Sequence, residues 1–330
     1  HDEFNLDLRV RAIARSQTML LGDRSIDLAR WQTDFADNAV DCDLASLEAH
    51  VNPDHLPHAV IIDCTASEHI ADMYPGWLDR GVHVITPNKK AFSGPIDHYA
   101  ALRESARHGN THCYYETTVG AALPIITTLR DLIDTGDEIR SLQGIFSGTL
   151  AYLFNVYDGS TPFSEIVRAA RESGYTEPDP RDDLSGMDVA RKLTILAREL
   201  GQTIEIGDFP VQSLVPEQLR DCSIEEFLDR LSEFDAEIKA LYQEADAGGK
   251  RLRYVARLGA DGSAAVALDA VDADHPFSNI NLTDNIVQFE TDRYSANPLV
   301  VQGPGAGPEV TAGGVFGDLL RLAHHLSPGA

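Results

Sequence analysis

The sequence predicts an α/β protein in which a doubly wound parallel sheet is joined to an inserted α+β domain. Short apolar runs alternate with helical patterns through the first third of the chain, as in a parallel sheet covered by helices. From about residue 117 the helices become longer and a hairpin pattern occurs, and residues 300–330 return to a strand–turn–helix pattern. The predicted domains are therefore residues 1–116 plus 300–330, and residues 117–299.

Three strands and one helix define the predicted parallel sheet. Strands are expected at residues 8–13, 59–62 and 82–85, and a helix at residues 68–80 ends before Gly81. Ligands of such sheets bind at the carboxyl ends of the strands. The residues at these ends are mostly polar or basic: Arg15 and Ser16, Cys64 and Thr65, and Asn88, Lys89 and Lys90.

The middle of the chain predicts mainly helices, with a hairpin near its end. Helices are expected at residues 124–133, 164–173 and 186–200, and one acidic helix or a pair of helices at 224–246; a further helix opens at residues 147–149 after a strand at 143–146. A hairpin is expected at residues 251–271 around Ala260-Asp261-Gly262. The tail predicts a strand at 299–301 and a helix at 310–326.

Composition excludes several classes of function. The 52 acidic residues against 27 Lys plus Arg give a formal net charge of −25, which repels nucleic acid. The sequence contains no apolar run of the ~18 residues that cross a bilayer, so no membrane partner is expected. The four cysteines lie far apart without a CxxC pair, which predicts a reducing, cytoplasmic location and no zinc site.

The densest polar segment, residues 174–192, is the first candidate site. Asp188 and Lys192 are four residues apart, so both project from one face of the helix at 186–200. Three interpretations of the segment stay open at this point. Asp188 and Lys192 could form a proton-transfer pair, Ser185 and Asp188 could form a capping box within a rigid turn, or the acids Glu177, Asp179, Asp182 and Asp183 could bind a divalent metal ion.

The pair Lys89 and Lys90 forms a second candidate at the end of a predicted parallel strand. A lysine there could face a phosphate or polarise a carbonyl group. The chain has only five lysines, and three of them fall in these two candidate segments: Lys89, Lys90 and Lys192.

The glycine-rich turn at residues 303–307 follows a strand and precedes a helix, as in dinucleotide-binding folds. It comes too late in the chain to be the first turn of such a fold, whose first strand and turn we expect before His1. If residues 8–13 are the second strand, its end selects the cofactor: a carboxylate favours NAD, whereas Arg accommodates the 2′-phosphate of NADP. Arg15 therefore predicts NADP, with NAD as the alternative.

Four motifs resemble those of homoserine dehydrogenase over residues 8–326: TPNKKA at 86–91, ETTVGAALPI at 116–125, GIFSGTL at 144–150 and GYTEPDPRDDLSGMDVARK at 174–192. The resemblance implies a Rossmann-like NAD(P)-binding domain with an inserted catalytic and dimerisation domain. It implies that L-homoserine and L-aspartate 4-semialdehyde are interconverted, in the biosynthesis of threonine and methionine.

The resemblance also implies roles for individual residues. Lys192 would be the general acid/base, with Lys89 and Asp188 beside it, and Glu177, Asp183 and Asp188 would bind the substrate. Thr65, Lys89, Gly174 and Gly307 would approach the cofactor, together with Arg15 and Ser16. A monovalent cation, expected to be sodium, would be bound by Glu116, Val119, Ala121 and Leu123, mostly through backbone carbonyls.

The resemblance extends to the dehydrogenase half of bifunctional aspartokinase–homoserine dehydrogenases. We therefore expect a homo-oligomer, a dimer or larger, and a possible aspartokinase domain upstream of His1, which is not a starting Met. Two other functions stay open: an acylating semialdehyde dehydrogenase, which needs a reactive cysteine, and a regulatory or scaffold domain that binds no cofactor.

Overall fold

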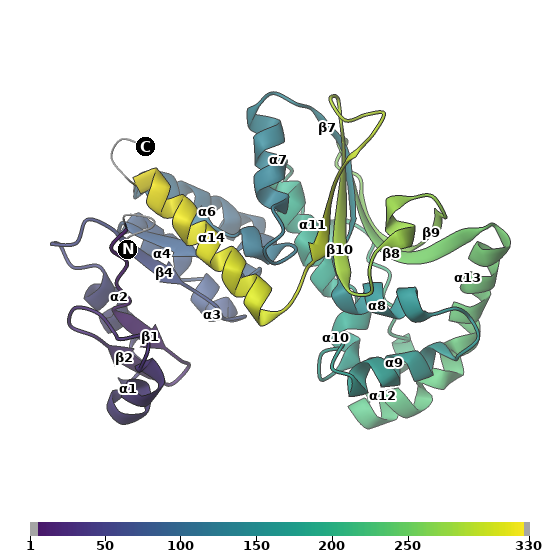
Figure 1. Ribbon diagram of the computed structural model, residues 1–330, viewed down its shortest axis with the longest axis horizontal. Coiled ribbons are helices and arrows are strands. Elements are labelled where there is room, and N and C mark those ends of the chain that lie inside the picture. The colour runs from purple at the N-terminus through teal and green to yellow at the C-terminus, as the bar shows by residue number, and fades with distance from the viewer. Residues whose placement is uncertain (1–5, 327–330) are drawn as a thin grey trace. The chain divides into compact units, whose positions relative to one another are not determined.

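The computed structural model describes residues 6–326, which form two compact units (Figure 1). Unit 1 comprises residues 6–86, 100–114 and 318–326, and unit 2 comprises residues 87–99 and 115–317. Two helices belong partly to each unit: α6 (Ile96–His108) and α14 (Pro308–Leu326). None of the helices in residues 6–326 combines the length and apolar character needed to cross a bilayer. The predicted domain limits near residues 116 and 300 stay predictions.

Unit 1 contains the predicted parallel sheet, with strand order β4–β5–β6. Its central strand β5 is buried along its whole length, as expected for a sheet covered on both faces, whereas β4 and β6 are only partly buried. The elements of this unit are β1 (Ala12–Ala14), β2 (Thr18–Leu21), α1 (Trp31–Asn38), β3 (Val40–Asp41), α2 (Leu44–Val51), β4 (Ala59–Ile62), α3 (Glu68–Ala71), α4 (Tyr74–Asp79), β5 (Val82–Ile85) and β6 (Cys113–Tyr114).

Two predictions in unit 1 need correction. Residues 8–13 were expected in the parallel sheet, but β1 pairs antiparallel with β2, and β3 completes a separate three-stranded sheet. β1 forms its ladder with β2, and the carbonyls of Val10 and Arg11 accept hydrogen bonds from the amides of Ile26 and Gly22, so this segment is paired with the residues that follow it in the chain. The helix expected at 68–80 is divided into α3 and α4, because Pro75 lacks an N–H donor and its ring disrupts the preceding turn.

Unit 2 is built around a five-stranded antiparallel sheet with the order β11–β10–β7–β8–β9. The predicted hairpin is confirmed as β8 and β9 (Figure 1). Its strands are β7 (Ile139–Ile145), β8 (Lys250–Gly259), β9 (Ala264–Asp272), β10 (Asp284–Thr291) and β11 (Leu299–Pro304). Its helices are α5 (Lys90–Ser93), η1 (Glu116–Thr118), α7 (Ile125–Asp134), α8 (Gly148–Val156), α9 (Phe163–Glu172), α10 (Pro180–Leu184), α11 (Met187–Glu199), η2 (Ile206–Asp208), η3 (Glu217–Leu219), α12 (Ile224–Arg230), η4 (Leu231–Phe234), α13 (Asp235–Ala247) and η5 (Pro276–Asn279).

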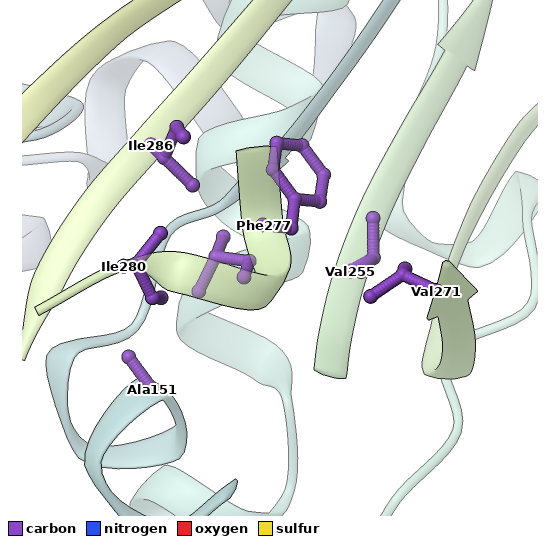
Figure 2. Packing of buried hydrophobic residues seen from close by; sticks show 7 residues of the cluster. Ala151, Val255, Val271, Phe277, Ile280 and Ile286 are labelled. Carbon is purple, nitrogen blue, oxygen red and sulfur yellow. The ribbon is translucent and has the colours of Figure 1, made fainter. Parts of the chain in front are cut away.

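One buried apolar cluster fastens α8 and η5 onto the sheet of unit 2. Figure 2 shows Phe277 of η5 between Ile286 of β10 and Val255 of β8, with Ile280 and Ala151 beside them. Phe277 and Ile286 are fully buried, and burying side chains of this size contributes about 2 kcal/mol each to folding. This cluster sets the position of α8, which follows directly after Phe146 and Ser147 at the end of β7.

Candidate active site

Helix α11 carries the central pair of the candidate site, and a glycine sets its start. Gly186 precedes the helix with a φ of +74°, and a Cβ atom there would lie 2.0 Å from the hydroxyl of Tyr254. Only glycine satisfies both conditions without strain. The first turn of α11 therefore begins at a defined place, and Asp188 and Lys192 follow on one face of it.

Lys192 is a buried lysine with two hydrogen-bond acceptors. The residue is 9% exposed, its Nζ lies 2.7 Å from Oδ2 of Asp188, and it donates a hydrogen bond of 2.7 Å to the carbonyl oxygen of Phe146. A buried ammonium group is stable only when it is paired and hydrogen-bonded. The predicted proximity of Asp188 and Lys192 is confirmed.

Lys89 joins the same carboxylate from the other side. It is the residue before α5, and its Nζ lies 3.3 Å from Oδ1 of Asp188. Burial raises the pKa of Asp188, but the charges of Lys192 and then Lys89 outweigh it and hold that pKa well below its ordinary value. Asp188 is therefore ionised at neutral pH and bridges two lysines, which we call the Lys89–Asp188–Lys192 cluster.

In the acidic loop before α11, some carboxylates bind backbone groups of the loop, and others are exposed to solvent. Asp179 caps α10 through the backbone amide of Arg181 and also binds the Arg181 guanidinium, as the rigid-turn interpretation expects. Asp183 accepts a hydrogen bond of 2.8 Å from the backbone amide of Glu177. Burial, opposed by that hydrogen bond, raises the pKa of Asp183. The carboxylate of Glu177 stays exposed.

Two other interpretations of residues 174–192 were a helix cap and a divalent-metal site. The helix-capping interpretation of Asp188 is wrong, because the N-cap of α11 is Gly186, no side chain caps the helix, and the Asp188 carboxylate binds the two lysines. The divalent-metal interpretation gains no support: within residues 6–326, no group of three or more His, Cys, Asp or Glu side chains is arranged to hold a metal ion.

The loop predicted to bind a monovalent cation turns sharply around Gly120 and Ala121, which both have positive φ angles. The two carboxylate oxygens of Glu116 accept hydrogen bonds from the amides of Ile126 and Thr127, at 2.7 and 2.8 Å, in the first turn of α7. Val119 and Ala121 are buried, while the carbonyl of Leu123 accepts a hydrogen bond from Ile125. A loop rich in carbonyl groups beside a buried carboxylate is suited to a hard cation.

The residues predicted to bind the cofactor divide between the two units. In unit 1, Arg15, Ser16 and Thr65 line one cavity of about 2050 Å³. Arg15 is exposed in the turn between β1 and β2, with its guanidinium 4.9 Å from the centre of the Phe35 ring. In unit 2, Gly174 follows α9 and Gly307 precedes α14, both with positive φ angles and with open space around their Cα atoms.

Sequence reasoning missed two features of the site. The carbonyl oxygen of Phe146 binds Lys192, but a backbone acceptor has no signature in the sequence. At the other end of α11, Glu199 binds Arg130 at 2.7 Å and accepts a hydrogen bond from the hydroxyl of Tyr115, and Arg198 is also buried. The sequence did contain a signal for these contacts, since Arg198 and Glu199 are two adjacent charged residues at the end of an amphipathic helix.

Comparison with known proteins places this chain in a family. The family models for homoserine dehydrogenase and for the homoserine dehydrogenase NAD-binding domain match residues 124–320 and 2–116. A bifunctional aspartokinase/homoserine dehydrogenase 2, chloroplastic, from Zea mays is 52% identical over 98% of this chain, which spans 36% of that relative. A homoserine dehydrogenase from Schizosaccharomyces pombe is 46% identical over 90% of this chain and 81% of its own length.

A solved structure agrees along almost the whole chain. The crystal structure of a Candida auris protein of unknown function matches with a TM-score of 0.91 and 37% identity, covering 98% of this chain and 93% of that one. Together with the NAD-binding model over residues 2–116, this confirms the predicted fold class. The chain belongs to the homoserine dehydrogenase family.

Proposed function

We propose that this chain is the catalytic portion of a homoserine dehydrogenase, which interconverts L-homoserine and L-aspartate 4-semialdehyde. The observation that carries the proposal is the position of Lys192, whose buried Nζ lies between the Asp188 carboxylate and the Phe146 carbonyl. An ammonium group has three N–H donors, and these two acceptors use two of them. We propose that the third binds the oxygen of the substrate.

The proton transfer that this reaction needs falls to Lys192. In the direction of reduction, the carbonyl carbon gains a hydride, and the developing alkoxide takes a proton from the ammonium group of Lys192. In the reverse direction, the neutral amine accepts the hydroxyl proton of homoserine as the carbon loses its hydride. Bound NAD(P) supplies or accepts the hydride.

The other members of the cluster set the electrostatics of this step. Asp188 compensates the charges of both lysines and holds the Lys192 side chain on the inner face of α11. Lys89 brings a second positive charge to the same carboxylate, where it stabilises negative charge developing on the substrate oxygen. A substrate with an ammonium group needs a carboxylate partner, and the exposed carboxylate of Glu177 supplies one, with Asp183 holding its backbone.

We propose NADP as the preferred cofactor. The basis is Arg15, whose exposed guanidinium lines the cavity of unit 1, since a guanidinium is well suited to pair with a ribose 2′-phosphate. Arg15 shares its cavity with Ser16 and Thr65, and the proposed set extends to Lys89, Gly174 and Gly307. Glycines with positive φ angles and open surroundings allow a ligand to approach the backbone closely.

A monovalent cation, sodium by our proposal, would be held by Glu116 and the carbonyls of Val119, Ala121 and Leu123. It would rigidify the loop that leads into α7. Replacing sodium by a bulky organic cation at constant ionic strength should lower the melting temperature and raise the KM for homoserine. An unchanged melting temperature and KM would contradict the proposed cation site.

We also propose two partners. One is a second copy of the chain in a dimer or larger oligomer, and the other is an aspartokinase domain upstream, as named in the bifunctional relatives. Light scattering on the purified chain measures the first directly. A monomer with full dehydrogenase activity would show that the oligomer is not needed for catalysis.

An acylating semialdehyde dehydrogenase fits the geometry less well. Such an enzyme needs a thiolate nucleophile with a lowered pKa. Burial, and then the charge of Asp63, raises the pKa of Cys64, which is the opposite direction.

The proposed function is tested by measuring the homoserine-dependent reduction of NADP through the absorbance of the NADPH that forms. We expect turnover with homoserine and NADP and no turnover when the hydroxyl group is absent, as with 2-aminobutyrate. A chain that neither binds NADP nor turns over homoserine would support the regulatory alternative instead.

A further inference from the structure

We propose that Arg198 is a positioning residue that holds Lys89 in place against Asp188, by fixing the α5 segment to helix α11. This inference rests on the proposed function, since Lys89 acts there on the substrate oxygen. Arg198 is only 4% exposed and occupies the last turn of the helix that also carries Asp188 and Lys192.

The guanidinium of Arg198 binds the end of α5 directly. It donates hydrogen bonds of 2.7 Å each to the carbonyl oxygens of Phe92 and Gly94, and further ones to the carbonyl of Ile204 at 3.1 and 3.3 Å. The last carbonyl groups of a helix have no partner within it. Arg198 supplies partners for those at the end of α5, and its plane also lies 5.3 Å from the centre of the Tyr99 ring.

The backbone of α5 transmits this anchoring to Lys89. The amides of Phe92 and Ser93 donate hydrogen bonds to the carbonyl of Lys89, at 3.1 and 3.0 Å, and the Ser93 hydroxyl donates another at 2.9 Å. The Phe92 ring is fully buried and stacks on Tyr115 at 3.8 Å between centres. Because α5 is a single turn held in this way, the backbone of Lys89, from which its side chain reaches Asp188, is tied to the carbonyls that Arg198 binds.

Burying the charged guanidinium of Arg198 costs folding free energy unless its N–H groups find hydrogen-bond acceptors. Burial lowers the pKa of Arg198, although Tyr99 and Glu205 partly oppose the shift. Every hydrogen bond that the guanidinium makes to a described residue ends on a backbone carbonyl, so no carboxylate compensates its charge directly. An arginine here binds two segments at once with its planar fork, which a lysine cannot do.

Arg253 provides a matched control within the same unit. It is 5% exposed and also donates only to backbone carbonyls, those of Leu252, Phe154, Phe277 and Ser278. Burial, and then the charge of Arg251, lowers its pKa to about 10. Arg253 fastens η5 and α8 to β8 and has no bond to α5, so its loss tests the general cost of removing a buried arginine.

The experiment compares R198K and R198M with R253K and R253M in the chain that contains both units. The first readout needs no activity: an amine-labelling reagent is applied, and the modification of Lys89 is quantified by mass spectrometry relative to Lys250. We expect labelling of Lys89 to rise several-fold in both Arg198 variants and to stay at the wild-type level in both Arg253 variants at temperatures below melting.

The second readout is steady-state homoserine oxidation. When Lys89 leaves Asp188, the positive charge that stabilises the developing charge on the substrate oxygen moves away, so the chemical step slows, whereas the proposed contact of Glu177 with homoserine is kept. We expect R198K to lower kcat about tenfold with a KM for homoserine within about twofold of wild type, whereas R253K keeps both wild-type values.

The two readouts separate the inference from the function it rests on. Raised labelling in the Arg198 variants without homoserine oxidation by the wild type would uphold the positioning role and refute the proposed function. Unchanged labelling of Lys89, or equal changes in labelling and kcat for the Arg198 and Arg253 variants, would overturn the positioning role even in an active enzyme.

Discussion

The carboxylate of Asp188 lies 2.7 Å from the Nζ of Lys192, one helical turn further along α11, and 3.3 Å from the Nζ of Lys89. The Asp188 carboxylate therefore pairs with two lysines whose segments lie about one hundred residues apart in the chain. The two lysines repel one another, so their proximity depends on the charge between them. This arrangement explains why an ionised carboxylate occupies the first turn of a largely buried helix.

Replacing Asp188 by asparagine should damage both stability and catalysis. The amide keeps the shape but leaves two ammonium groups without their shared counter-charge, so we expect the free energy of unfolding to fall by about 1–3 kcal/mol. The kcat should fall about tenfold or more because both lysines lose their position. Urea unfolding and steady-state kinetics measure these effects. D182N, which changes an exposed acid on α10, is the control, and equal effects in the two variants would contradict this role.

The start of α11 depends on Gly186, so Gly186→Ala should destabilise the chain. The new Cβ would meet the Tyr254 hydroxyl, and alanine disfavours a φ of +74°. We expect a loss of about 2–4 kcal/mol in the free energy of unfolding. The control is Gly313→Ala, inside α14, where the added Cβ has no neighbour within 4 Å and should stabilise the helix slightly. The prediction fails if both variants melt at the wild-type temperature.

The sequence predicted some of this site for clear physical reasons. The spacing of Asp188 and Lys192 placed both on one helical face, and the parallel order of β4 and β5 follows from their apolar runs. Pro75 was a visible signal that the helix expected at 68–80 would be interrupted, but the helical periodicity of the apolar residues outweighed it. No such signal predicted that β1 would pair with β2, because an apolar strand does not specify its neighbour. The approach of Lys89 to Asp188, and the Phe146 carbonyl, depend on tertiary packing and could not be derived from spacing.

Arg15 should determine the choice between the two nicotinamide cofactors. In Arg15→Asp, a carboxylate would repel the 2′-phosphate of NADP and accept a hydrogen bond from the free ribose hydroxyl of NAD. The KM for NADP should therefore rise far more than the KM for NAD, which kinetics with each cofactor measures. R24D introduces the same charge at another exposed position of unit 1 and should affect neither. Equal effects of R15D on both cofactors would remove Arg15 from this role.

Four histidines in unit 1 should make the protein sensitive to mild acid. His83 is 3% exposed, with the His112 ring 5.6 Å and the His58 ring 6.0 Å away, and His325 lies 4.1 Å beyond His112. Burial, and then the neighbouring histidines, lower the pKa of His83 from 6.5 to about 4. A lowered pKa in the folded state means that the unfolded chain binds the proton first. The stability is therefore complete above pH 6.5 and declines as the pH falls from there towards 4.

Urea unfolding at different pH values tests this linkage. Between pH 7 and pH 5, His83 should reduce the free energy of unfolding by about 2 kcal/mol. The variant H83Q should show a flatter dependence over this interval, whereas H55Q, at an exposed position, should follow the wild type. A wild type and an H83Q variant with parallel pH dependences would contradict the assignment to His83.

The most direct test of the central claim is the turnover of K192A. If Lys192 transfers the proton, its loss should lower kcat on the order of 100- to 10,000-fold, while the dissociation constant for NADP stays close to the wild-type value. The matched control K239A removes an exposed lysine of α13 and should leave both quantities unchanged. A K192A enzyme that keeps more than about a tenth of the wild-type kcat would contradict the account.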